Sequence, residues 1–172
     1  KEWSLDAYRY IITSKETILR AYGVTIFVTI VGTLMSTLVV ALYAYPLSRK
    51  EFKARNFFAF FFVFTMYFSG GMIPTYLLYK DLNLINNPLI MIISGGLSIY
   101  NMIVTRTYYQ NSIPDSLYEA GRIDGSSEIG IFFKIALPLS MPIIAVMCLY
   151  YAVGHWNGYF TALMYLTKTK FQ

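Results

Sequence analysis

Charged side chains are scarce in this sequence of 172 residues: 13% of the residues are charged, whereas 56% are hydrophobic. A soluble domain of this size carries about a quarter charged residues, because water must wet its surface. The chain has too few polar groups to cover itself, which argues against an ordinary soluble domain. Lipid is the surrounding that fits best, and a soluble obligate oligomer with a very apolar interface is the alternative.

Cysteine is nearly absent, and so are the motifs of common enzymes and nucleotide-binding proteins. The single cysteine, Cys148, lies inside an apolar run, without a disulfide partner in the chain or metal-ligand spacing around it. No GxxxxGK[ST] motif is present to cradle a phosphate, and no nucleophile with a neighbouring base is recognisable. We therefore predict a chain that is not an enzyme and that binds no metal or cofactor of its own.

The excess of basic residues has a pattern of its own. There are 14 basic and 9 acidic residues, a net charge of +5, which indicates either nucleic acid or a membrane surface. The bases cluster between apolar runs and are not interleaved with aromatic residues, so we predict no nucleic-acid partner. Four of them lie in residues 48–55, and a short loop this basic marks the cytoplasmic side of a membrane.

Four apolar runs are long enough, or nearly so, to cross a membrane, which takes about 20 residues as a helix. The runs are residues 22–47, 57–79, 88–105 and 139–166. Helix is favoured over strand because barrel strands appear as alternating segments of about 10 residues. The sequence thus predicts an all-α fold, a transmembrane helical bundle that forms a single domain over residues 1–172.

Glycine and proline modify this simple picture. Gly70, Gly71 and Pro74 interrupt the second run, and we expect a broken helix there, near the outer surface. Gly32 and Ser36 lie four residues apart in the first run, a spacing that lets helix backbones approach closely.

The link at residues 106–138 is too long for a simple turn. Ser112 precedes Pro114 and Asp115, which predicts a helix capped by Ser112. Ile113, Leu117 and Ala120 would share its apolar face.

The second half of this link has its own signals. Gly125 predicts a sharp turn, because glycine tolerates a positive φ, and Ser126 or Ser127 would cap a second helix. Pro138 and Pro142 would end or kink that helix. The result is a helical hairpin on the cytoplasmic side, which either serves as a lever for a partner or packs on the membrane surface.

The spacing of residues in this link resembles the EAA loop of the membrane subunits of binding-protein-dependent ABC importers. The matching positions are Glu119, Ala120, Gly121, Gly125, Ile135, Leu137 and Pro138. One position departs, because the family usually has alanine where this chain has Gly121. The segment from Gly71 to Tyr76 and the pair Trp156 and Asn157 are similar to the maltose-type sugar permease group, and especially to permeases for oligosaccharides released from complex polysaccharides.

The resemblance implies an ABC importer type I permease fold in a bacterial cytoplasmic membrane. Members usually have six spans, and this chain would hold spans two to five. The implied partners are a second permease subunit, two ATP-binding cassette subunits that bind ATP and Mg²⁺, an extracellular solute-binding protein and the lipid bilayer.

The resemblance also implies roles for the loop residues. Glu119 would pair with basic or donor groups of the ATPase subunit, and Ala120 and Gly121 would allow close backbone contact with it. Gly125 would set the angle between the two helices. The remaining residues would anchor the loop to the fourth span; they are Ile135, Leu137 and Pro138.

A substrate path is less sharply marked. Sugars are held by aromatic faces and hydrogen-bonding side chains, and such residues occur in the third and fourth runs. The candidates are Tyr100, Asn101, Tyr150, Tyr151, His155, Trp156 and Asn157. Each has a plain alternative, since Tyr and Trp also populate membrane interfaces and a lone histidine is often a contact between helices.

Three other functions stay open at this point. The loop pattern is shared by ABC importers of non-sugar solutes. An ion-coupled transporter would need acidic or basic residues well inside the membrane, and the four runs lack them. A membrane-embedded enzyme would need paired catalytic groups there.

Overall fold

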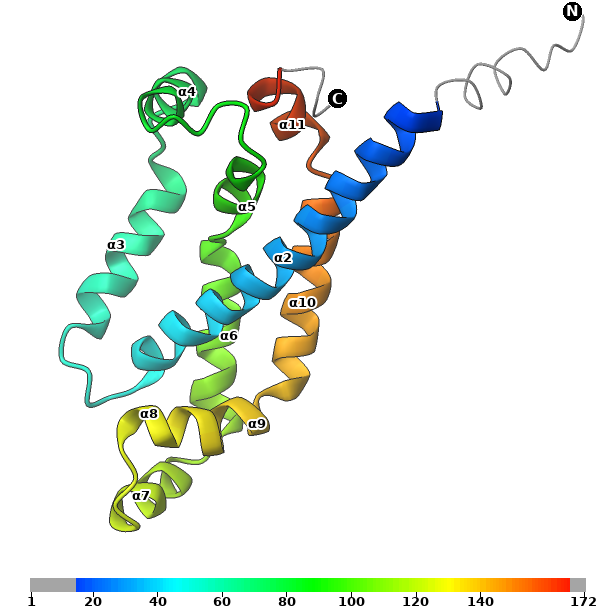
Figure 1. The fold of residues 1–172 in the computed structure, drawn as a ribbon. Helices are drawn as coiled ribbons and strands as arrows, with labels where there is room; N and C mark the ends of the chain where they lie inside the picture. The colour runs from blue at the N-terminus through cyan, green and yellow to red at the C-terminus, as the bar shows by residue number, and fades with distance from the viewer. Residues whose placement is uncertain (1–14, 168–172) are drawn as a thin grey trace, which may run out of the picture.

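A computed structural model describes residues 15–167, with side chains described from residue 18 onward, and this stretch consists of helices and the loops between them (Figure 1). The predicted all-α bundle is therefore confirmed. Within this stretch, one helix is long and apolar enough to cross a membrane by itself, and up to four spans result if each bent pair of helices counts as one.

The first apolar run forms one continuous helix, α2 (Lys15–Ser48). Gly32 and Ser36 lie on its buried face with Ala41 and Ala44, and these small side chains let α5, α6 and α10 approach closely. The expected role of Gly32 and Ser36 in close packing is thus confirmed. Large apolar residues such as Leu34 cover the exposed face.

The second run is broken, as predicted. It forms α3 (Arg55–Tyr67) and α4 (Met72–Asp81), which meet at 111°. Gly71 lies at the break with a φ of +86°, a conformation that strongly favours glycine. Pro74 follows in the first turn of α4, where its missing N–H is not needed.

The third run is also bent, and it continues further than its hydropathy suggested. It comprises α5 (Leu89–Gly95) and α6 (Ile99–Ser112), which meet at 55°. The predicted end at residue 105 was wrong, because Arg106 extends the helix while its Nε donates to the Leu47 carbonyl at 2.9 Å. The link to the next span therefore begins near residue 113.

A hairpin follows, made of α7 (Asp115–Ile123) and a second arm that curves into the bundle. The second arm contains α8 (Glu128–Ile131), the π-helical turn η1 (Phe132–Ala136) and α9 (Leu137–Leu139). This arm meets α10 (Met141–Trp156) at 79°. The predicted kink between Pro138 and Pro142 is therefore confirmed.

The fourth run is not one span over residues 139–166, and that prediction was wrong. The helix α10 ends at Trp156, and α11 (Tyr159–Tyr165) begins after Gly158. Asn157 ends α10, and its Nδ2 donates back to the Val153 carbonyl at 3.0 Å. An Asn-Gly pair is a turn signal that the apolar character of the run concealed.

Figure 1 shows the arrangement that these elements produce: α2 crosses α6 and α10, with the hairpin at one end of the bundle and α4 and α11 at the other. The main core draws side chains from α2, α6, α10 and the hairpin. A smaller core lies at the opposite end, around Ile90, Tyr165 and Leu166.

Candidate functional site

The hairpin turns at Gly125, as the sequence predicted. Gly125 has a φ of +74°, and its N–H donates to the Arg122 carbonyl at 3.0 Å. The Ser126 N–H donates to the Gly121 carbonyl at 3.0 Å, so the turn satisfies carbonyls at the end of α7. On the far side Ser127 caps α8, since its Oγ accepts from the Gly130 N–H at 3.1 Å.

The start of α7 differs from the prediction. Ser112 is the last residue of α6, and Pro114 precedes α7 without a side-chain cap. The predicted apolar face was also wrong, because Leu117 and Ala120 are exposed and only Ile113 is buried.

The buried face of α7 is formed by Tyr118 and Gly121. Gly121 lies against the second arm, where an added Cβ would be 2.9 Å from Ile135 Cδ1 and 3.1 Å from Ile131 Cγ1. The expected contact of Gly121 with a partner does not fit this position, because the residue is covered by its own hairpin. It permits close contact between the two arms instead.

The other face of the hairpin points away from the bundle and is both apolar and acidic. Glu119 and Ala120 are exposed on it, and Ile123 and Ile129 are 85% and 71% exposed. We call these residues, with Leu117, the outer face of the hairpin. An exposed apolar patch beside a carboxylate is suited to contact with another protein.

The second arm connects the hairpin to the rest of the bundle. Ile135 and Leu137 are partly buried against the main core, and Pro138 is exposed in the short α9. Beyond the bend, Ser140 is buried, and its Oγ lies 3.4 Å from the Tyr109 hydroxyl on α6. The arm therefore continues directly into α10.

Ion pairs hold the hairpin to the loop that follows α2. Arg122 Nη1 lies 2.8 Å from a carboxylate oxygen of Glu51 in the loop, and its Nε lies 2.7 Å from one of Glu128 within the hairpin. These pairs raise the pKa of the Arg122 guanidinium and, with Arg122 as the main cause, lower the pKa of Glu51. Asp115, at the start of α7, pairs with Arg49 and Lys50 at 3.3 and 3.0 Å.

Sequence reasoning missed these contacts, because it treated the bases of residues 48–55 as topology signals only. A usable signal was present, since the hairpin segment contains four acidic residues and the loop after α2 contains four bases, which are opposite charges that can pair. The acids are Asp115, Glu119, Asp124 and Glu128.

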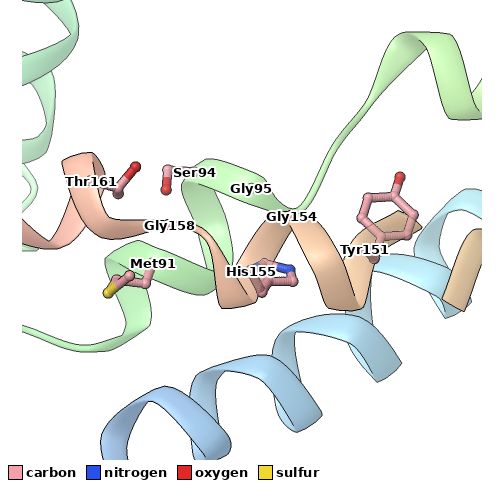
Figure 2. A pocket seen from close by; sticks show the side chains of 8 residues that line it. All are labelled: Met91, Ser94, Gly95, Tyr151, Gly154, His155, Gly158 and Thr161. Carbon is pink, nitrogen blue, oxygen red and sulfur yellow. The ribbon is translucent and has the colours of Figure 1, made fainter. Parts of the chain in front are cut away.

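Only some of the candidate substrate-path residues come together (Figure 2). Tyr151 and His155 are buried and line a cavity of about 190 Å³ between α5, α10 and α11. His155 and Trp156 also line a neighbouring hollow of about 570 Å³. Asn101 is buried in α6, and Tyr100, Tyr150 and Asn157 are exposed, and none of these four lines either space.

His155 also makes a close contact between helices, the plain alternative considered for it. Its Nε2 lies 3.3 Å from Ser36 Oγ on α2. Its ring fills the space over two glycines, since an added Cβ at Gly32 or Gly95 would lie 2.7 or 2.9 Å from a ring atom. The residue thus both fastens α2 to α10 and faces the cavity.

Comparison with known proteins gives a consistent result. Residues 38–172 match the family described as "Binding-protein-dependent transport system inner membrane component". The chain belongs to this family. Among curated relatives, the polygalacturonan/rhamnogalacturonan transport system permease protein YtcP of Bacillus subtilis (strain 168) is 48% identical over 167 residues, which are 97% of this chain and 58% of YtcP. Protein LplC of the same organism is 45% identical over 169 residues, 98% of this chain and 57% of LplC.

A solved structure of a transport protein also has the fold of this inner membrane component. It is titled "Crystal structure of a bacterial ABC transporter involved in the import of the acidic polysaccharide alginate", and it matches with a TM-score of 0.88 at 34% identity. The match covers 96% of this chain and 58% of that one. The chain therefore spans a little more than half the length of the relatives that it matches.

Proposed function

We propose that this chain is part of the pore-forming subunit of an ATP-driven importer, and that it translocates a sugar or oligosaccharide delivered by an extracellular binding protein. The observation that carries the proposal is the hairpin. Its inner face is fastened to the bundle, while Glu119, Ala120 and Ile123 on its outer face stay exposed. A partner that docks there could move the bundle without touching the substrate.

The proposed assembly contains a second permease subunit, two ATP-binding cassette subunits and the binding protein, in a bacterial cytoplasmic membrane that the subunit crosses several times. ATP and Mg²⁺ would be bound by the cassette subunits. Large apolar surfaces outside the hairpin support such surroundings, since α3 has no buried residue and exposes several phenylalanines. Lipid or neighbouring subunits would cover them.

The nature of the solute is inferred from the relatives' names and from the cavity. YtcP is named for polygalacturonan and rhamnogalacturonan, and the solved relative is titled for alginate. Tyr151 and His155 give the cavity an aromatic ring and a polar ring, groups that suit a carbohydrate. The path would pass these two residues rather than the exposed Tyr100 and Asn157.

The proposed mechanism is a rigid-body switch. Closure of the cassette subunits around ATP would carry Glu119 and its neighbours along, and Gly125 would keep the two arms at a fixed angle. Ile135, Leu137 and Pro138 would pass the movement into α10, which lines the cavity through Tyr151 and His155. Such switches work because packed interfaces have discrete arrangements.

A charge reversal on the outer face tests the proposal. We expect Glu119→Lys, in the full-length chain reconstituted with its partners, to lower sugar uptake per ATP hydrolysed by about 10-fold or more, because like charges at an interface cost several kcal/mol. Asp81→Lys is the matched control, since it makes the same charge change on an exposed residue at the opposite end of the bundle. Wild-type coupling in Glu119→Lys would remove the coupling role.

The same vesicles separate the other functions. Uptake that survives mutation of the ATPase catalytic residues would indicate an ion-coupled transporter. ATP-driven uptake of a non-sugar solute, with no uptake of oligosaccharides, would keep the coupling role and change the substrate class.

A further inference from the structure

The first helix of the hairpin has a second attachment, apart from the arm that leads into α10. It lies at Arg49, directly after the end of α2. The Arg49 side chain is 9% exposed, and its guanidinium carbon lies 3.6 Å from the centroid of the Tyr118 ring. Its Nη2 is 3.3 Å from Asp115 Oδ1. One guanidinium therefore grips α7 at two points, a ring and a carboxylate.

Tyr118 is itself held firmly beneath this guanidinium. The residue is fully buried, and its ring lies 6.1 Å from that of Tyr45, one turn before Arg49 on α2. Tyr45 also contacts Phe132 and Tyr109, at 5.1 and 5.9 Å between ring centroids. Burial raises the pKa of Tyr118 to about 12, so the ring stays neutral and presents its face to the cation.

The end of α2 is held as firmly as the hairpin. Arg106 Nε on α6 donates to the Leu47 carbonyl at 2.9 Å. The Ser48 hydroxyl donates to the Tyr45 carbonyl at 2.6 Å, and the Arg49 N–H donates to the Pro46 carbonyl at 3.1 Å. Carbonyls that a helix end would leave without partners are thereby satisfied. Arg49 thus projects from a fixed point.

Lys50 provides a contrast within the same site. Its Nζ lies 3.0 Å from Asp115 Oδ2, but its side chain is 77% exposed. An exposed ion pair contributes little because water screens it. Arg49 and Lys50 thus carry the same charge and both pair with Asp115. They differ in burial, in the contact with Tyr118, and in a longer pairing of Arg49 Nε with Glu51 Oε2 at 3.6 Å.

We propose that Arg49 is a positioning residue that locks α7 to the end of α2, so that movement of the hairpin enters the bundle through α2 as well as through α10. This inference rests on the proposed coupling function of the hairpin. The helix α2 is well placed for it, because it packs along α10, α5 and α6 and contacts His155 at the cavity through Ser36. Movement of the hairpin would then reach α2 and α10, on two sides of the proposed path, at the same time.

The functional test compares Arg49→Ala with Lys50→Ala in the full-length chain, assembled with its partners in vesicles. We expect Arg49→Ala to lower uptake per ATP hydrolysed by about 10-fold, within the range found for residues that carry coupling. Lys50→Ala should stay within about 2-fold of wild type, as an exposed pair predicts. Arg49→Lys should fall between them, because an ammonium lacks the planar fork that stacks on a ring. Equal effects of Arg49→Ala and Lys50→Ala would overturn the proposal.

A second measurement does not depend on transport. Spin labels would be placed on Ile123 in the hairpin and Leu42 in α2, both exposed, in a background without other cysteines. We expect Arg49→Ala to broaden the distance distribution between the labels, and Lys50→Ala to leave it unchanged. A distribution in Arg49→Ala as narrow as in wild type would overturn the lock, even if uptake were lost. Absence of ATP-driven uptake in the wild type would instead count against the proposed function, and the label distances would still decide the attachment.

Discussion

Aromatic contacts occur at both ends of the bundle, but among the described residues the ion pairs lie at the hairpin end. At the hairpin end, ion pairs of 2.8 to 3.3 Å join the loop after α2 to the hairpin, and further pairs of 3.6 and 2.7 Å lie within the loop and within the hairpin. At the opposite end, Tyr165 of α11 contacts Tyr76 and Tyr79 of α4, with ring centroids 6.0 and 5.2 Å apart. Its carbonyl also accepts from the Asn86 N–H at 2.9 Å.

The difference indicates what each end is built for. Ion pairs and a stacked guanidinium fix direction as well as distance, which suits an element that passes on movement. The aromatic contacts at the opposite end tolerate offset and tilted geometries, and tyrosine is also common at membrane interfaces. Under the proposed coupling function, the hairpin end is the one that would pass movement on to the bundle.

The largest expected effect comes from a substitution in the smaller core, at the end of the bundle opposite the hairpin. We expect Tyr165→Ala to lower the free energy of unfolding in detergent by about 3 kcal/mol, as for other buried aromatic residues, because Tyr165 is only 6% exposed. Tyr159→Ala in the same helix is the control, since Tyr159 is 74% exposed. The label distance between Ile123 and Leu42 should not change. A disturbed hairpin in Tyr165→Ala would show that the two ends are not separate.

The next largest effect comes from a substitution at the contact between α2 and α10, which lies between the two ends. We expect Gly32→Leu to cost about 2 kcal/mol by overpacking, because an added Cβ would lie 2.7 Å from His155 Nε2 and α2 and α10 would have to separate. Gly23→Leu is the matched control in the same helix, where an added Cβ meets nothing within 4 Å. Thermal unfolding of the two variants decides the point, and equal stabilities would contradict the close packing at Gly32.

The smallest expected effect concerns pH, and it tests whether the ion pairs hold the hairpin in place. The ion pairs with Lys50 and Arg122 hold the pKa values of Asp115 and Glu51 below their usual range. Their stabilisation is therefore complete above the pKa of about 4 of an unfolded carboxylate, and is lost only as the pH falls through the lowered values. We expect the distance between labels on Ile123 and Leu42 to stay constant from about pH 8 to about pH 5. A change within that window would mean that other groups hold the hairpin.

Features with local signals were predictable from the sequence. Gly125 marked the turn because few residues other than glycine adopt its conformation readily, and Gly71 marked the break in the second run in the same way. The end of α6 was misjudged at residue 105, since a helix continues past its apolar run when a charged residue such as Arg106 finds a partner.

Features that depend on distant partners were not predictable. The burial of Tyr118 and Gly121 rather than Leu117 follows from residues on other elements, among them Arg49, which lies 69 positions before Tyr118. The spacing of residues within α7 is compatible with burial of either face of the helix. The contact of His155 with Ser36 likewise joins residues that are 119 positions apart.

The most direct measurement places a cysteine at Ile123, the most exposed of the large apolar residues on the outer face, in a full-length chain without other cysteines and assembled in its native membrane. The account predicts a cross-link from this position to an ATPase subunit, and protection from membrane-impermeant thiol reagents added outside the cell. Labelling from outside, or the lack of any cross-link to an ATPase subunit, would contradict it.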